Sequence, residues 1–334
     1  MIISRTPFRI SFFGGGTDYP KWYRQHGGSV LGCTINKYCY LTVRELPPFF
    51  EHKHRIVYSK VENVKTIAEI EHPAVRAVLS EFAVTTGLEI HHDGDLPARS
   101  GLGSSSSFTV GLLHALNALR GQIASKATLA HEAIRIEQDV IQENVGSQDQ
   151  IWAAYGGLNR IDFHTDGAFD VQPLVIPSER RRALQDHLFL VFTGFSRYAS
   201  EIAAAKIANL DQRTNHLKAM QAMVDQAASI LASPTTPIDE FGALLHESWK
   251  LKRGLSNSVS NSSIDEIYEA GRSAGALGGK LLGAGGGGFM LFFVRPHDRA
   301  RLKAKLGLLI DVAFEFESSG SKIVIYEPDG LATR

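Results

Sequence analysis

Three glycine-rich segments, far apart in the chain, hold the residue types best suited to bind phosphate and hydroxyl groups. The middle segment, residues 97–107, reads Pro-Ala-Arg-Ser-Gly-Leu-Gly-Ser-Ser-Ser-Ser, and it follows a predicted strand and opens a predicted helix. Glycines let the backbone approach a phosphate closely, and the first turn of a helix offers unpaired N–H groups. The alternative is an ordinary serine-rich helix cap. The favoured interpretation is a phosphate-binding loop formed by Arg99, Ser100, Gly101, Gly103, Ser104, Ser105 and Ser106.

Two familiar nucleotide motifs are excluded by what surrounds these glycines. The middle segment does not end in Gly-Lys-Ser/Thr, so it is not a Walker A loop. The last segment, residues 283–288, formally contains GxGxxG, but a dinucleotide-binding fingerprint must follow a strand and open a helix. Here the glycines precede the apolar run 289–294, which is a predicted strand, so a nicotinamide cofactor is excluded.

The first segment, residues 7–19, predicts a strand that ends in a glycine turn with a carboxylate just beyond it. A carboxylate in that place can accept hydrogen bonds from two sugar hydroxyls, which makes Asp18 a candidate substrate ligand. Its neighbours Gly15, Gly16 and Thr17 are included in the same predicted subsite. The competing interpretation is simple turn chemistry, in which aspartate commonly follows a glycine turn.

The three segments, in this order, resemble the motifs of the GHMP kinases, a group that includes galactokinase, homoserine kinase and mevalonate kinase. The resemblance covers almost the whole chain, and three motifs in a common order are more specific than any one of them. It implies an α+β fold with a ribosomal-S5-like N-terminal domain and a ferredoxin-like C-terminal domain. It also implies a left-handed βαβ crossover, an exception to a strong rule.

The same resemblance assigns roles to particular residues. Glu137, followed by Gly146 and Asp149, matches the galactokinase-like pattern of a magnesium-binding glutamate and a catalytic aspartate. It implies that Ser105 and Glu137 hold Mg²⁺, since this cation needs only one or two protein oxygens besides phosphate and water. It implies that Asp149 receives or orients the acceptor hydroxyl, and that Arg9 keeps Asp149 ionised and stabilises the transferred phosphoryl group.

The predicted acceptor is a sugar phosphate. Galactokinases carry Glu-His where this chain has Gly15-Gly16. In contrast, residues 8–20, 146–150 and 193–197 are similar to D-glycero-α-D-manno-heptose-7-phosphate 1-kinases of bacterial surface-polysaccharide pathways. A phosphorylated acceptor needs a second cationic cluster. Candidates are Arg197, Lys252 within the basic run 249–253, and the run 52–55. The third motif adds Gly285 and Gly286 to the predicted substrate site.

Other functions remain open at this stage. Within the enzyme class, the alternative is an anomeric kinase of a neutral sugar such as fucose, galactose or mannose. From another class comes a non-catalytic regulator that binds sugar and ATP on the same fold, and a decarboxylase on this fold is a weaker option. Intact Arg9, Glu137 and Asp149 argue against the regulator, because a sensor has no use for the whole set.

The composition is that of an ordinary globular enzyme. The 334 residues are 44% hydrophobic and 21% charged, with 35 basic residues against 35 acidic ones, so neither nucleic acid nor an anionic membrane is an expected partner. The two cysteines, Cys33 and Cys39, favour reduced thiols over a disulfide framework. Without a recognisable signal peptide or a run of about 20 apolar residues, we expect a cytoplasmic protein, monomeric or homodimeric, whose partners are ATP and a sugar phosphate.

Apolar periodicity and turn residues predict how these sites are positioned. Strands are predicted at 1–13, 29–43, 55–60, 88–91, 188–192, 289–294 and 322–327. Helices are predicted at 72–86, 105–119, 127–144, 197–232, 238–255 and 263–275, and Gly146 is expected to end the helix at 127–144. A further helix after Ser147 is expected to start with a capping box that pairs Ser147 with Gln150. An exposed connection within 173–186 divides the chain into domains 1–180 and 181–334.

Overall fold

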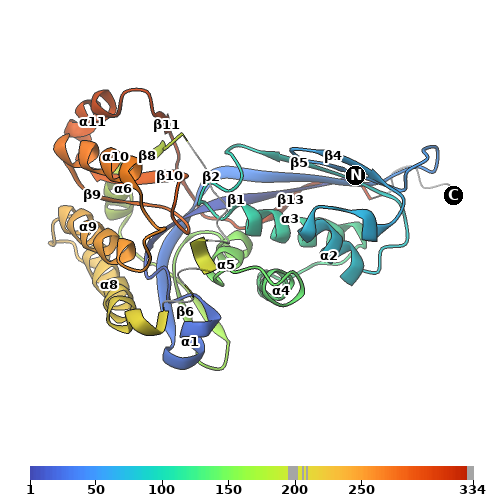
Figure 1. Ribbon diagram of the computed structural model, residues 1–334, viewed down its shortest axis with the longest axis horizontal. Helices are drawn as coiled ribbons and strands as arrows, with labels where there is room; N and C mark the ends of the chain where they lie inside the picture. The colour runs from blue at the N-terminus through green and yellow to red at the C-terminus, as the bar shows by residue number, and fades with distance from the viewer. Residues whose placement is uncertain (195–201, 205–206, 208–209, 329–334) are drawn as a thin grey trace.

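The structure is a computed structural model that describes residues 1–194, 202–204, 207 and 210–328. These residues form a nine-stranded sheet and a four-stranded sheet, which lie toward opposite ends of an elongated molecule (Figure 1). None of the helices among them is both long and apolar enough to cross a membrane. The mixed architecture confirms the α+β prediction.

The larger sheet is organised around β2 (Gly28–Glu45), an 18-residue strand that pairs with four others. The main path of the sheet runs β13-β1-β2-β5-β3-β4; β6 and β12 also pair with β2, and β7 pairs with β6. Its strands are β1 (Ile2–Phe13), β3 (His54–Val57), β4 (Val61–Val64), β5 (Leu88–Gly94), β6 (Leu158–Phe163), β7 (Phe169–Pro173), β12 (Phe316–Glu317) and β13 (Lys322–Tyr326). Among these strand pairs, only β3 and β5 run parallel. The left-handed crossover that the resemblance implies stays a prediction.

Helices cover one face of this sheet, as Figure 1 shows below the blue strands. The central one, α3, is buried on most of its surface and packs against β1 and β2, because its sequence is apolar or small almost all round. Gly111 lets it approach the sheet, since a Cβ there would lie 2.9 Å from Thr6 Oγ1. The helices of this half are α1 (Pro20–His26), α2 (Pro73–Glu81), α3 (Ser104–Leu119), α4 (Lys126–Arg135) and α5 (Gln148–Tyr155).

The smaller sheet has the ferredoxin-like arrangement that the family resemblance implied. Its four strands follow the order β11-β8-β10-β9, all antiparallel, with the fully buried β10 inside the sheet. The strands are β8 (Leu188–Phe192), β9 (Ala276–Leu281), β10 (Phe289–Val294) and β11 (Ile310–Val312). The helices are α6 (Ser178–His187), α8 (Thr214–Ala232), α9 (Asp239–Arg253), α10 (Ser262–Ser273) and α11 (Arg299–Leu306).

Some predicted boundaries are wrong. The helix expected at 127–144 ends early: α4 stops at Arg135 and continues only as a π-helical turn, Ile136–Val140. The segment expected as a strand at 55–60 divides into β3 and a turn. Within the described residues the helix expected at 197–232 is α8, preceded by a 3₁₀ turn at Leu210–Arg213, and most of its first part lies outside them. Elements without a clear pattern were not predicted, namely α1, α6, α11, β4, β6, β7, β9, β11 and β12.

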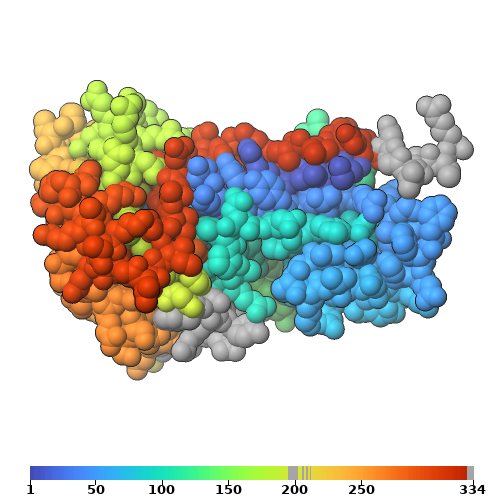
Figure 2. All heavy atoms as spheres, turned by 90° about the horizontal axis from the view of Figure 1, so that it is seen from above, coloured from blue at the N-terminus to red at the C-terminus, as the bar shows by residue number. Residues whose placement is uncertain are grey.

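The last strands of the chain return to the larger sheet. β13 pairs with β1, and β12 pairs with β2. Figure 2 shows this as red residues lying beside the blue first strands, away from the orange C-terminal half. The division of the chain at residue 180 stays a prediction. The strand pairing shows that β12 and β13 belong to the same sheet as the first strands of the chain.

The two halves meet where the second and third glycine-rich segments touch. A Cβ on Gly101 would lie 2.6 Å from the carbonyl oxygen of Leu282, and a Cβ on Gly283 would lie 2.4 Å from the Cα of Gly101. The amide of Phe289 donates to the carbonyl of Ser100 at 3.1 Å. Both glycines also have positive φ, +85° at Gly101 and +66° at Gly283, which side chains disfavour. Glycine is required here both for conformation and for close approach.

We therefore expect Gly101→Ala to destabilise the protein more than Gly121→Ala does. Gly121 has a similar φ of +70° but nothing within 4 Å of its Cβ position, so it reports the conformational cost alone, about 1–2 kcal/mol. The measurement is the free energy of unfolding of the two variants in denaturant. Equal losses would show that the contact between the two segments has no part in stability.

Candidate active site

A cleft with a cavity volume of about 160 Å³, open to solvent, lies between the two sheets and is lined by all three glycine-rich segments. Twelve of the predicted site residues line it: Arg9, Gly15, Gly16, Asp18, Arg99, Gly101, Gly103, Ser104, Ser105, Ser106, Asp149 and Lys252. Residues that sequence reasoning did not assign to the site also line it, among them Ser11, Tyr19, Asn144, Gln148 and Lys280.

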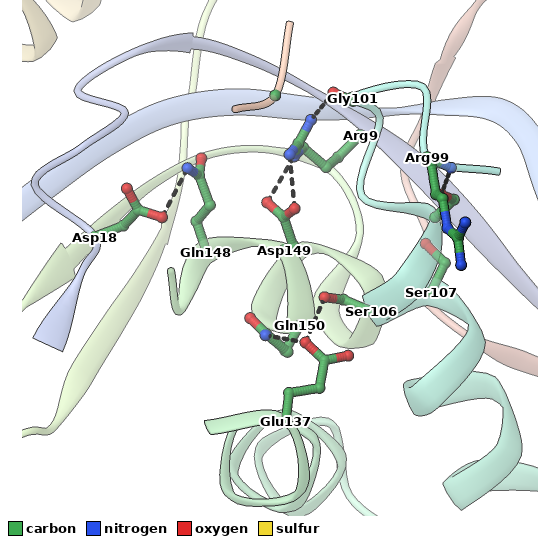
Figure 3. A network of polar contacts seen from close by, with 12 residues as sticks. Arg9, Asp18, Arg99, Gly101, Ser106, Ser107, Glu137, Gln148, Asp149 and Gln150 are labelled. Carbon is green, nitrogen blue, oxygen red and sulfur yellow. Dashed lines mark hydrogen bonds and ion pairs between the residues drawn. The ribbon is translucent and has the colours of Figure 1, made fainter. Parts of the chain in front are cut away.

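The centre of the cleft is an ion pair between Arg9 on β1 and Asp149 in the first turn of α5. The Nε of Arg9 donates to one carboxylate oxygen at 2.7 Å, and its Nη2 donates to the other at 2.6 Å. The remaining Nη1 donates to the carbonyl of Gly101 at 2.6 Å (Figure 3). Arg9 is 4% exposed, and the paired fork-to-carboxylate geometry is the strong form of this interaction. Asp149 is therefore fixed in orientation while it still faces the cleft.

Asp18 lies beside this pair and is held by two donors. The backbone amide of Gly16 donates to one oxygen at 2.8 Å, and the Nε2 of Gln148 donates to the other at 2.8 Å. Burial raises the pKa of this carboxyl, and the negative charge of Asp149 raises it further. The neighbouring Thr17 does not line the cleft, because its hydroxyl is buried and donates to the carbonyls of Gly14 and Ser29.

Gly146 was predicted to end a helix, but in the structure it makes room for the side chain of Asp18. Its Cβ would lie 1.9 Å from the carboxylate oxygen of Asp18, so only glycine leaves room for this acid. The amide of Ser147 donates to the backbone carbonyl of Asp18 at 2.9 Å. The loop before α5 is thus built around Asp18.

The capping box predicted for α5 is wrong. The side chain of Ser147 caps no backbone amide; its hydroxyl contacts the hydroxyl of Tyr23 and the amide of Gln138. Gln150 turns instead toward Glu137. Both side chains serve contacts between elements, which a local sequence pattern does not reveal.

The phosphate loop turns into α3 at Gly103, whose φ of +76° places it in the left-handed region. The helix begins at Ser104, so the unpaired amides of its first turn and the positive end of its dipole face the cleft. The amide of Arg99 donates to Ser104 Oγ at 3.1 Å. Ser100 has a structural role and does not line the cleft: it is buried, and its hydroxyl donates to the carbonyl of Pro97.

Glu137 lies in the π-helical turn below the phosphate loop and is 1% exposed. One carboxylate oxygen accepts from the hydroxyl of Ser106 at 2.9 Å and from the amide of Gln150 (Figure 3). The other, Oε1, has no hydrogen-bonding partner among the described residues. Burial raises the pKa of this carboxyl to about 7. The serine that contacts Glu137 is Ser106, whereas Ser105, which was predicted to share a cation with it, is exposed.

These residues fit a magnesium ion held partly by phosphate. An unpaired buried carboxylate oxygen beside a serine hydroxyl is the kind of ligand set Mg²⁺ uses when nucleotide phosphates complete its shell. Among the described residues, no three His, Cys, Asp or Glu side chains cluster in a way that could hold a metal ion alone. A cation at Glu137 would therefore depend on a bound nucleotide.

Two buried lysines bring further positive charge. The Nζ of Lys252 on α9 donates to the carbonyls of Leu281 and Gly283, and the Nζ of Lys280 on β9 donates to the carbonyl of Phe12. Both line the cleft, but only Lys252 was predicted from sequence. Gly285 and Gly286 do not line it and pack against Val259.

Two other cationic candidates were predicted from sequence. The basic run 52–55 does not line the cleft. Arg197 lies outside the described residues, so its predicted contact with substrate stays a prediction.

The site has what phosphoryl transfer requires: amides for phosphate, positive charge, and a positioned carboxylate for the acceptor. The chain matches the models of the GHMP kinase N-terminal domain over residues 65–157 and the GHMP kinase C-terminal domain over 227–308. A D-glycero-α-D-manno-heptose 7-phosphate kinase from Campylobacter jejuni is 30% identical over 95% of this chain and 97% of its own length. The chain is a phosphotransferase. It belongs to the GHMP kinase family and is a sugar kinase, with ATP implied as the phosphate donor.

More distant relatives agree with this assignment. A bifunctional fucokinase/GDP-fucose pyrophosphorylase from Arabidopsis thaliana is 27% identical over 88% of this chain, which corresponds to 30% of that protein. The crystal structure of a D-glycero-D-manno-heptose 1-phosphate kinase from Bacteroides thetaiotaomicron superposes with a TM-score of 0.79 at 22% identity, covering 98% of this chain and all of the other. At that identity the structural likeness establishes the shared fold.

The raised pKa of Glu137 leads to a prediction about stability. Because its pKa is about 7 in the folded protein and about 4.5 ordinarily, the folded state binds the proton more tightly. Its contribution to stability therefore falls as pH rises from about 4.5 to 7 and stays low above that. We expect the stability of Glu137→Gln relative to wild type to rise over this window by an amount on the order of 3 kcal/mol without metal or nucleotide.

The measurement is the free energy of unfolding of both proteins at pH 4.5, 6, 7 and 8. Asp139→Asn is the matched control, since Asp139 is an exposed carboxylate in the same π-helical turn. A difference between Glu137→Gln and wild type that stays constant with pH would contradict the buried, proton-binding state of Glu137.

Proposed function

We propose that this chain is an ATP- and Mg²⁺-dependent kinase that phosphorylates the C1 hydroxyl of D-glycero-D-manno-heptose 7-phosphate to give the 1,7-bisphosphate, a surface-polysaccharide precursor. The observation that carries the proposal is the position of Asp149. It faces the cleft at the start of α5, it is held by Arg9, and it lies beside the phosphate loop, since a Cβ on Gly103 would be 3.4 Å from its Oδ2.

In the proposed reaction, Asp149 accepts a hydrogen bond from the acceptor hydroxyl and takes its proton as the oxygen attacks the γ-phosphorus. The bond from the γ-phosphorus to the bridging oxygen breaks, and ADP leaves with that oxygen. Arg9 has two roles: it orients the carboxylate of Asp149, and it adds positive charge near the transferred group. Phosphoryl transfer is mostly positioning and charge neutralisation, so these two side chains and the loop amides meet its main needs.

The phosphate loop residues at the start of α3 would hold the ATP phosphates by backbone amides and hydroxyls, with Arg99 at the edge of the cleft. Glu137 and a serine of the loop would hold Mg²⁺. Ser106 is favoured over Ser105 by its contact with Glu137. When bound, the ion neutralises charge on the ATP phosphates.

The choice of acceptor has two supports. The heptose 7-phosphate kinase relative aligns over nearly all of both chains. The cleft is lined by four cationic side chains, Arg9, Arg99, Lys252 and Lys280, against two carboxylates, Asp18 and Asp149. An excess of positive charge suits a cleft that binds a triphosphate together with an acceptor that already carries phosphate. The fucokinase relative makes a neutral sugar the second candidate.

The role of Asp149 is tested by Asp149→Asn, which keeps the shape of the side chain but removes the charge and the proton acceptor. We expect kcat to fall about 10²–10⁴-fold, the usual contribution of a positioned acid or base. The dissociation constant for ATP should change less than about threefold. Asp170→Asn, an exposed carboxylate on β7 that is paired with His164, is the control. A near-normal kcat in Asp149→Asn would contradict the mechanism.

The acceptor is tested by coupled ADP release with Mg²⁺ across a panel of substrates. The panel contains heptose 7-phosphate, the heptose without phosphate, mannose, mannose 6-phosphate, fucose, galactose and mevalonate. We expect kcat/KM for heptose 7-phosphate to exceed that of every other member by at least about tenfold. A preference for the unphosphorylated heptose or for fucose would leave the kinase assignment intact and overturn the proposed acceptor.

A further inference from the structure

Two polar side-chain atoms lack hydrogen-bonding partners, although the residues that carry them line the cleft and are almost fully buried. Ser11 on β1 is 7% exposed, and Gln148 at the start of α5 is 8% exposed. Neither the hydroxyl of Ser11 nor the Oε1 of Gln148 meets a donor or acceptor among the described residues. A buried polar atom without a partner costs about 1–3 kcal/mol. Two such atoms lining one cleft therefore indicate a ligand that supplies their partners.

The orientation of Gln148 is fixed by its neighbour. Its Nε2 donates to a carboxylate oxygen of Asp18 at 2.8 Å. The amide oxygen of Gln148 therefore points away from Asp18, as Figure 3 shows. What the free Oε1 needs is a donor, and a sugar hydroxyl is one.

Ser11 and Gln148 both lie close to Gly15. A Cβ on Gly15 would be 3.8 Å from Ser11 Oγ and 3.8 Å from the Nε2 of Gln148, with no other atom among the nearest contacts within 4 Å. A side chain at position 15 would therefore contact both residues. Gly15 thus keeps open a polar pocket bounded by Ser11, Gln148 and Asp18, next to the residue proposed to accept the proton.

We infer that Ser11 and Gln148 form a subsite for acceptor hydroxyls, in which a hydroxyl near the reacting one donates to Gln148 Oε1 and another exchanges a hydrogen bond with Ser11. This inference rests on the proposed sugar kinase reaction and adds two specificity-determining residues to it. The subsite selects a polyhydroxylated acceptor, because an acceptor without these hydroxyls leaves both buried atoms unpaired.

The test compares Ser11→Ala with Ser248→Ala. Both serines are buried and have no partner for their hydroxyls, but Ser248 lies on α9 and does not line the cleft. A structural role alone predicts the same result for both, which is unchanged or slightly increased stability. We expect Ser11→Ala to raise the KM for the sugar about 5- to 10-fold without changing the KM for ATP, and Ser248→Ala to change neither.

Analogues of the sugar that each lack one hydroxyl complete the test. With one of these analogues, the KM of the wild type should rise by about the same factor. The KM of Ser11→Ala should not rise further with that analogue, as a double-mutant cycle requires. An unchanged sugar KM in Ser11→Ala would overturn the inference. So would independent, additive effects of the substitution and of the missing hydroxyl with every analogue.

These outcomes are distinct from failure of the proposed acceptor. The wild-type panel alone decides whether heptose 7-phosphate is the preferred sugar. The ratios between variants and wild type are measured with whichever sugar the wild type phosphorylates best.

Discussion

The structure of the cleft depends on stabilising carboxylates that are partly or wholly removed from water. A carboxylate that loses water needs other hydrogen-bond donors in its place. Asp149 has the guanidinium of Arg9, Asp18 has an amide of the backbone and one of Gln148, and Glu137 has Ser106 and Gln150. In these contacts only Asp149 is paired with a full positive charge. Burial raises the pKa of the other two carboxyls, that of Glu137 to about 7.

The elements around the cleft are placed by these contacts. β1 carries Arg9 and runs along the whole larger sheet, so its position is fixed by pairing with β2 on one side and β13 on the other. The start of α5 is held by Asp18 through Ser147 and Gln148. The π-helical turn brings Glu137 beneath the phosphate loop, and such turns are frequent at functional sites.

Much of this was predictable from sequence, because motifs and strong strands are local. β1, β8 and β10 were predicted within a residue or two, as was the start of α3, since runs of apolar residues and the glycine–serine boundary mark them directly. Gln148 and Ser11 were missed for the opposite reason. Each has a buried atom without a hydrogen-bonding partner, and only the packed structure reveals which atoms these are. Gly146 shows the same limit, because its apparent role as a helix terminator hid a contact with an acid 128 residues earlier in the chain.

Two lysines contribute positive charge to the same cleft. Both Lys252 and Lys280 are almost fully buried, and their ammonium groups donate to backbone carbonyls of the glycine-rich third segment or of β1. Carbonyl oxygens stabilise an ammonium group without cancelling its charge. Positive charge is thereby held in the cleft by backbone carbonyls. A polyanionic nucleotide would meet a field that is already in place, so little reorganisation is needed when charge develops on the transferred phosphoryl group.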